Sequence, residues 1–266
     1  MSESAAEQKG SVVYEAVAAT GEKSVIPVPD PGAPPPDLGC WDLVAAVLRS
    51  ARRALLYGPP ATGKTHIASY IGGDKPTYSV TLTEDMPEAE LRGHYIPKGN
   101  EFVWQDGPAI RAWREGANLV LNEINRASPE VLSFLFVLLD DPKTAILTLP
   151  TGETVRPHSE FRVFGTMNGE PGMLPEPLQD RFPVQIHVDK TNPAVLELFP
   201  KEMRKLVKRT MDLSGERRIT VRQWLAFWEL LCRGAEVDAA GPSVFRDKWE
   251  GLRESILLAL APAGNK

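Results

Sequence analysis

The sequence is poor in cysteine and has no long hydrophobic segment. Only two of its 266 residues are cysteine, Cys40 and Cys232, which are too few for a disulfide framework or a zinc site. The longest apolar run, Val131 to Leu139, is far shorter than the roughly 20 residues that a membrane-spanning helix needs, and it predicts a buried helix. These features favour a protein of the reducing cytoplasm.

Charge of one sign does not dominate either. The net charge of −5 gives no general attraction to nucleic acid or to an anionic membrane, although it leaves room for a local basic patch. The first ten residues, MSESAAEQKG, contain neither a basic nor an apolar stretch, so we expect no secretory signal. We therefore expect no membrane partner and rank nucleic acid low among the ligands.

The chain divides into three expected parts. Residues 1–37 are small and polar and end in a proline-rich run, Val28 to Asp37, which predicts an extended, flexible lead-in. In residues 38–191 short apolar strands alternate with helical spacing, which predicts an α/β fold with a parallel sheet covered on both faces. Residues 192–266 show helical apolar spacing alone, which predicts a small all-α domain. The five expected strands are Ala54–Gly58, Tyr78–Thr83, Asn118–Leu121, Phe161–Met167 and Val184–Val188.

Two segments of the α/β part have hairpin character. They are Tyr95–Trp104 and Ala145–Pro157, and in the second one Thr151 and Gly152 lie between two alternating strands. Both segments interrupt the alternation of strands and helices.

The segment GPPATGKT fits the pattern Gly, four residues, Gly, Lys, Ser or Thr. It follows a predicted strand and opens a predicted helix, where backbone N–H groups close around phosphate oxygens. Lys64 would reach the β- and γ-phosphates of a nucleotide, and the Thr65 hydroxyl would ligate Mg²⁺. The predicted nucleotide-binding residues are those of this segment and the one that follows it: Gly58, Pro59, Pro60, Ala61, Thr62, Gly63, Lys64, Thr65 and His66.

The stretch NLVLNEINRA, from Asn118 to Ala127, places polar side chains at the end of a predicted buried strand. Nucleotide hydrolysis requires one group that holds the magnesium ion and its waters and another that positions the attacking water. Glu123 supplies the second group. Asn122 stands where a carboxylate is expected for the first, and its amide oxygen accepts hydrogen bonds but carries no charge. We therefore predict a weakened metal site at Thr65 and Asn122.

Four motifs occur in order within residues 40–190: GPPATGKT, LVLNEINRA, GTMNG and LPEPLQDRF. Together they resemble the MoxR and dynein-related, midasin-like branch of the AAA+ ATPases, and the helical tail resembles it more loosely. The resemblance implies a P-loop AAA+ fold with a five-stranded sheet, β-hairpin insertions at the two positions found above, and a helical lid. It also implies ATP and Mg²⁺ as cofactors, and homo-oligomeric rings, usually hexameric, with ATP at the interfaces.

The resemblance further implies roles for individual residues. Asn168 matches the sensor-1 position, a polar residue near the γ-phosphate and the attacking water. Arg181 matches the arginine finger that reaches the nucleotide of the neighbouring subunit, and such fingers contribute on the order of 10³ to 10⁵ in turnover. Arg222 resembles the sensor-2 arginine of the lid, with Arg217 and Arg218 as nearby alternatives.

Three functions remain open at this point. The first is an ATP-driven ring ATPase that remodels or activates a partner, such as the proteins with a von Willebrand factor A domain that are frequent partners in this branch. The second is a structural subunit that binds nucleotide but hydrolyses little, because Asn122 weakens the metal site; the combination of Glu123, Asn168 and Arg181 argues against it. The third, a motor subunit of a nucleic-acid-processing complex, ranks last because the residues after Asn168, GEPG, do not match the guanine-linked signature of a related GTP-using restriction subunit. Arg126 is typical of the branch, and no role is assigned to it.

Overall fold

The computed structural model describes residues 13–17, 23–27, 41–213 and 215–260. The chain forms two compact units, residues 1–37 and 38–266. The proline-rich run at 28–37 and Cys40 lie outside the described residues.

The first unit contains one antiparallel pair of strands, β1 (Val13–Val17) and β2 (Lys23–Pro27). The sequence patterns do not predict this pairing, because the surrounding segment has the composition of a linker. A single two-stranded hairpin is marginally stable by itself.

The second unit is built on a parallel sheet of five strands. They are β3 (Arg53–Tyr57), β4 (Thr77–Thr81), β7 (Asn118–Asn122), β10 (Arg162–Thr166) and β11 (Val184–His187). They lie in the order β11-β3-β10-β7-β4, and every neighbouring pair is parallel. The predicted α/β fold is thereby confirmed, and each predicted strand is present.

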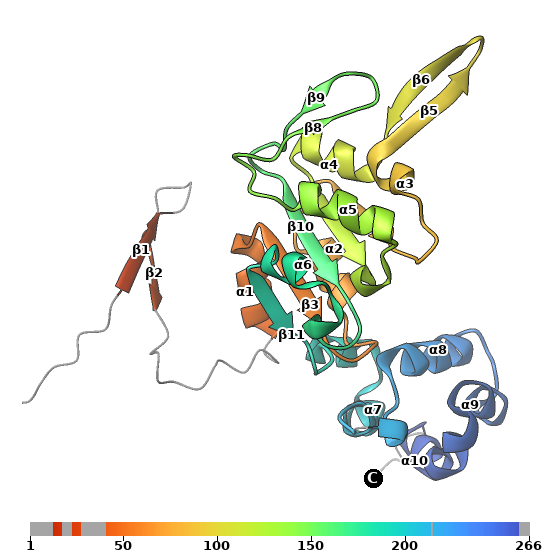
Figure 1. The fold of residues 1–266 in the computed structure, drawn as a ribbon. Helices are drawn as coiled ribbons and strands as arrows, with labels where there is room; N and C mark the ends of the chain where they lie inside the picture. The colour runs from red at the N-terminus through yellow and green to blue at the C-terminus, as the bar shows by residue number, and fades with distance from the viewer. Residues whose placement is uncertain (1–12, 18–22, 28–40, 214, 261–266) are drawn as a thin grey trace, which may run out of the picture. The chain divides into compact units, whose positions relative to one another are not determined.

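Helices cover both faces of this sheet (Figure 1). They are α1 (Trp41–Ser50), α2 (Lys64–Tyr70), α3 (Glu88–Arg92), α4 (Pro108–Glu115), α5 (Pro129–Leu138) and α6 (Glu176–Asp180). Successive side chains of a strand point to opposite faces, so Leu55 belongs to the core under α4 and α5, whereas Leu56 belongs to the core under α1 and α2. The predicted buried helix is α5, and it begins at Pro129 because the Ser128 side chain accepts a hydrogen bond from the Val131 N–H at 3.2 Å.

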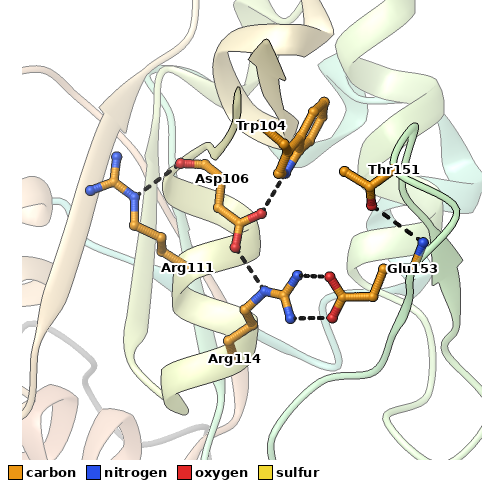
Figure 2. A network of polar contacts seen from close by, with 6 residues as sticks. All are labelled: Trp104, Asp106, Arg111, Arg114, Thr151 and Glu153. Atoms are coloured by element: carbon orange, nitrogen blue, oxygen red, sulfur yellow. Dashed lines mark hydrogen bonds and ion pairs between the residues drawn. The ribbon is translucent and has the colours of Figure 1, made fainter. Parts of the chain in front are cut away.

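Two β-hairpins occur at the predicted positions. Their strands are β5 (Gly93–Lys98), β6 (Glu101–Asp106), β8 (Leu147–Thr148) and β9 (Thr154–Val155). Arg114 of α4 binds both hairpins, as Figure 2 shows. Its Nε donates to Asp106 Oδ2 at 2.7 Å, and its two terminal nitrogens donate to the carboxylate oxygens of Glu153 at 2.6 and 2.7 Å. One guanidinium group therefore fixes the two insertions to the same helix.

The last part of the chain is helical and has a hydrophobic core of its own. Its helices are α7 (Lys201–Met211), α8 (Val221–Cys232), α9 (Val237–Phe245) and α10 (Trp249–Leu260). Trp224 is fully buried there, and its Nε1 donates to Thr210 Oγ1 at 2.9 Å. The domain boundary predicted between residues 191 and 192 stays a prediction, since residues 38–266 form one compact unit. Short 3₁₀ helices occur at Ile124–Arg126, Pro171–Met173, Pro193–Leu198, Gly215–Arg217 and Arg246–Lys248.

Within the described ranges, none of these helices is both long and apolar enough to cross a membrane.

Candidate nucleotide-binding site

The phosphate loop connects the end of β3 to the start of α2, and two of its glycines are required by the backbone. Gly58 and Gly63 have φ angles of 127° and 104°, which residues with a Cβ rarely adopt. A Cβ at Gly58 would also come within 2.8 Å of the Val188 carbonyl oxygen. The sequence pattern therefore reflects backbone geometry as well as ligand chemistry.

Lys64 is 6% exposed, and its ammonium group is turned back onto the loop. It donates to the carbonyl oxygens of Gly58 and Pro59 at 3.0 and 2.7 Å, and to Asn168 Oδ1 at 3.2 Å. Burial lowers the pKa of Lys64 to about 8, although the Glu123 carboxylate acts in the opposite direction. This cation is thus held between the loop and the end of β10.

Glu123 follows β7 directly and has a left-handed backbone, with φ 54° and ψ 46°. The Arg126 N–H donates to its carbonyl oxygen at 2.8 Å and closes this turn. Its carboxylate accepts a hydrogen bond from Asn168 Nδ2 at 2.8 Å. Because β7 and β10 are neighbours in the sheet, Lys64, Asn168 and Glu123 form one continuous line of contacts.

Asn122 is 7% exposed, and both polar atoms of its amide are bonded within the protein. Its Nδ2 donates to Ser79 Oγ at 2.9 Å, and its Oδ1 accepts from Thr166 Oγ1 at 3.1 Å. The Thr166 hydroxyl lies 3.4 Å from that of Thr65. The hydrogen bonds of Asn122 therefore lead to the phosphate loop through Thr166, a residue within GTMNG to which the sequence analysis assigns no role.

A cavity of about 550 Å³ opens between the phosphate loop, the ends of β7 and β10, and α8. Among the predicted site residues, those that line it are Pro60, Ala61, Thr62, Gly63, Lys64, Thr65, His66, Glu123, Asn168 and Arg222. The predicted residues outside its wall are Gly58, Pro59, Asn122 and Arg181. The lining residues that the motifs do not predict are Thr166, Val221, Leu225, Ala226 and Glu229.

A more apolar cavity of about 480 Å³ adjoins the first one, and the two share part of their walls. Trp41 lines it, and a Cβ built at Gly63 would lie 3.4 Å from its indole ring. The Trp41 Nε1 donates to the Lys190 carbonyl oxygen at 3.3 Å, which fixes the ring beside the loop. The polar cavity can take phosphates, and its apolar neighbour can take a ring.

The arginines of the predicted site have different surroundings. Arg222 lines the polar cavity, whereas Arg218 lines a separate cavity beside Pro59. Arg181 stacks over the Phe136 ring and donates from Nε to the Phe136 carbonyl oxygen at 3.0 Å. Its role as an arginine finger stays a prediction.

Oxygen atoms supply the side-chain groups in the cavity wall that could face a cation. They belong to the hydroxyls of Thr62, Thr65 and Thr166, the carboxylates of Glu123 and Glu229, and the amide of Asn168. Hard cations such as Mg²⁺ prefer oxygen ligands and are commonly held by few protein groups together with phosphates. In the part of the chain that the structure describes, no three His, Cys, Asp or Glu side chains gather to hold a metal.

Known proteins match the same part of the chain. The family described as AAA domain (dynein-related subfamily) matches residues 53–182. An uncharacterized protein of Staphylococcus aureus strain NCTC 8325 / PS 47 is 37% identical over 231 aligned positions, with 76% of this chain and 86% of that protein covered. A relative from S. aureus strain USA300, also uncharacterized, is 35% identical over 179 positions, with 63% of this chain and 64% of that protein covered. This chain thus spans just under two thirds of the USA300 relative.

The solved structure of NtrX from Brucella abortus in complex with ADP shares the fold. Its TM-score is 0.56 at 18% identity, with 82% of this chain and 58% of that chain covered. The match to residues 53–182 contains β3, the phosphate loop, Glu123 and Asn168. The family match and the 37% identical relative show that the chain belongs to the dynein-related subfamily of AAA ATPase domains.

Proposed function

We propose that this chain is an ATP-hydrolysing ring ATPase that remodels or activates a partner protein. The observation that supports hydrolysis is the line of contacts from Lys64 through Asn168 to Glu123. It connects the cation that would hold the transferred phosphate to the carboxylate that would position the attacking water. Positioning and charge stabilisation are most of what phosphoryl transfer requires of a protein.

The two adjoining cavities support a nucleoside triphosphate as the ligand. The polar one would take the phosphates, with Lys64 and Arg222 as the nearby cations. The apolar one would take the base beside Trp41. Bound Mg²⁺ would neutralise phosphate charge, and Thr65 would be its protein ligand.

The decisive test is the variant Glu123→Gln, which keeps the size of the side chain and removes its charge. We expect its turnover number for ATP to fall by about 10² to 10⁴, while its affinity for ATP stays within a few-fold of the wild-type value. Glu130→Gln is the matched control, because Glu130 is an exposed carboxylate on the nearby α5. If Glu123→Gln hydrolyses ATP as fast as the control, Glu123 does not position the water.

A nucleotide-binding subunit with little hydrolysis is the second candidate, and the neutral side chain of Asn122 favours it. The variant Asn122→Asp would add a negative charge two hydrogen bonds away from Thr65. We expect it to raise the turnover number or to lower the Mg²⁺ concentration that gives half-maximal activity. No change in either quantity would reject the account of a weakened metal site.

Partner binding is supported by the side chains that the first hairpin exposes. Phe102 is 74% exposed and Tyr95 is 45% exposed, and both lie on strands outside the main sheet. Assembly is supported by the family, since AAA domains typically form oligomers. A pull-down with ATP and Glu123→Gln should retain a partner that wild type releases, and equal recovery from both would argue against ATP-dependent capture.

A further inference from the structure

A second chain of polar contacts runs beside the line that joins Lys64 to Glu123. The Thr65 and Thr166 hydroxyls lie 3.4 Å apart, the Thr166 hydroxyl donates to Asn122 Oδ1 at 3.1 Å, and Asn122 Nδ2 donates to Ser79 Oγ at 2.9 Å. The register of the sheet produces this alignment, because Thr166 of β10 stands opposite Asn122 of β7. Thr166 is 2% exposed and Asn122 is 7% exposed, so water does not substitute readily for the hydrogen bond between them.

The donors and acceptors in this series of hydrogen bonds determine which hydroxyl donates to which. The Asn122 Nδ2 can only donate, and it is turned toward Ser79, so Oδ1 is the atom that faces Thr166. Thr166 has one hydroxyl proton, and once it donates this proton to Asn122 it can offer Thr65 only a lone pair. The Thr65 hydroxyl then donates to Thr166, and its own lone pairs are left for the cavity.

We propose that Thr166 is a positioning residue that transmits the orientation of the Asn122 amide to the Thr65 hydroxyl, and so sets how well that hydroxyl binds the Mg²⁺ of a nucleotide. This inference rests on the proposed function, because it concerns the same site. If the amide turns over, Nδ2 faces Thr166, and Thr166 must donate to Thr65. One Thr65 lone pair is then occupied, and its proton turns into the cavity, where it repels a cation.

We call the hydrogen bonds from Asn122 through Thr166 to Thr65 the relay. Through the relay, Asn122 affects Mg²⁺ binding in a way that differs from the mere loss of a charge. A carboxylate at position 122 would accept through both oxygens, so only the favourable proton order would exist. An amide permits both arrangements of the hydroxyl protons, so a fraction of the molecules has the unfavourable arrangement. A charge effect would act on the cation through space, whereas the effect of proton order must pass through the Thr166 hydroxyl.

The test measures ADP affinity by calorimetry with Mg²⁺ and with a chelator, so that hydrolysis does not contribute. The ratio of the two affinities is the Mg²⁺-dependent gain. Thr166→Val keeps the shape of the side chain without its hydroxyl, and we expect it to reduce the gain by about three- to tenfold, the value of one hydrogen bond. Thr166→Ser keeps the hydroxyl without the methyl group and should retain the wild-type gain.

A double-mutant cycle with Asn122→Asp separates the relay from a charge effect. Asn122→Asp should increase the gain in the wild-type background and leave it nearly unchanged in the Thr166→Val background. An equal increase in both backgrounds would overturn the relay. A Mg²⁺-dependent gain in Thr166→Val equal to that of the wild type would also overturn the relay. The relay would likewise be overturned if the gain fell in both Thr166 variants in step with their melting temperatures, because both results indicate packing alone. A wild-type chain that binds no ADP, or binds it without any Mg²⁺-dependent gain, would instead overturn the proposed function.

Discussion

At the scale of single residues, the surroundings of Lys64 shift the pKa of its ammonium group. Burial among the loop carbonyls and Asn168 lowers its pKa to about 8, Glu123 raises the pKa, and Arg218 lowers it further. Bound phosphates would favour the charged ammonium form. Nucleotide binding must therefore take up a proton wherever the free protein holds Lys64 in its neutral form.

We accordingly expect the affinity for ADP, measured without Mg²⁺, to fall as the pH rises above about 8. Between pH 7 and pH 9 the loss should be about tenfold, which corresponds to one proton taken up on binding. The Lys64→Arg variant stays charged throughout this range, so its profile should be flat whatever its absolute affinity. A wild-type profile as flat as that of the arginine variant would contradict a lowered Lys64 pKa.

The sequence predicts the residues of this site that belong to local motifs. Lys64, Thr65 and Glu123 stand beside glycines or strand ends, so their positions relative to the backbone follow from a few neighbouring residues. Thr166 lies within the motif GTMNG, but the sequence assigns it no role, because by itself it is an ordinary β-branched residue of a strand. Its importance comes from its register with Asn122, 44 residues away.

At the scale of elements, the contacts of Arg114 connect the two hairpins. Asp106 ends β6 and Glu153 precedes β9, and the Arg114 side chain lies between these two carboxylates (Figure 2). The Trp104 Nε1 donates to Asp106 Oδ1 at 2.7 Å, which holds that carboxylate toward α4. Glu153 raises the pKa of Arg114 through its hydrogen bonds, so the pair stays charged at neutral pH.

Replacing Arg114 with alanine should loosen the second hairpin while the sheet remains folded. We expect faster amide hydrogen exchange in β8 and β9 but little loss of global stability, because the pair is partly exposed and exposed ion pairs contribute little. Arg253→Ala is the matched control, since Arg253 forms the same two-fold pair with Asp238, at 2.7 and 2.9 Å, in the helical part. Exchange in β8 and β9 that rises equally in both variants would show that Arg114 has no specific role there.

The hairpins were predicted as elements, but their connection was not. Alternating residues around Gly152 and a glycine-containing turn at Gly99 are local signals, and both glycines have positive φ angles of 85° and 64°. Arg114 and Glu153 are 39 residues apart, and no periodicity relates them. The β1–β2 pairing was missed for another reason, because its strands lie in a segment with linker composition.

At the scale of the whole molecule, the cavity lies between the sheet and α8, and Arg181 is not among the residues that line it. The Arg181 guanidinium is bonded to the carbonyl oxygens of Phe136 and Pro177, at 3.0 and 2.9 Å. An arginine finger would have to exchange these partners for the phosphate of a neighbouring subunit. That exchange can be tested by mixing subunits.

Arg181→Ala keeps the residues of its own cavity, and Glu123→Gln keeps Arg181. If the finger acts between subunits, an equal mixture should hydrolyse ATP several-fold faster than the mean of the separate variants, because some Arg181→Ala sites then meet an intact arginine. Adding the double variant Arg181→Ala/Glu123→Gln to Arg181→Ala provides the control, and it should give no increase. A mixture that only reproduces the mean would exclude action in trans.

The backbone conformation of Glu123 lowers stability, at the residue that we propose is needed for turnover. A side chain other than glycine in the left-handed region costs on the order of 1 to 3 kcal/mol, and Glu123 has a φ of 54°. A screen for heat-resistant variants should therefore select glycine at position 123. We expect the proteins selected in this way to melt at a higher temperature and still to bind ATP, but to lack the carboxylate that we propose positions the attacking water.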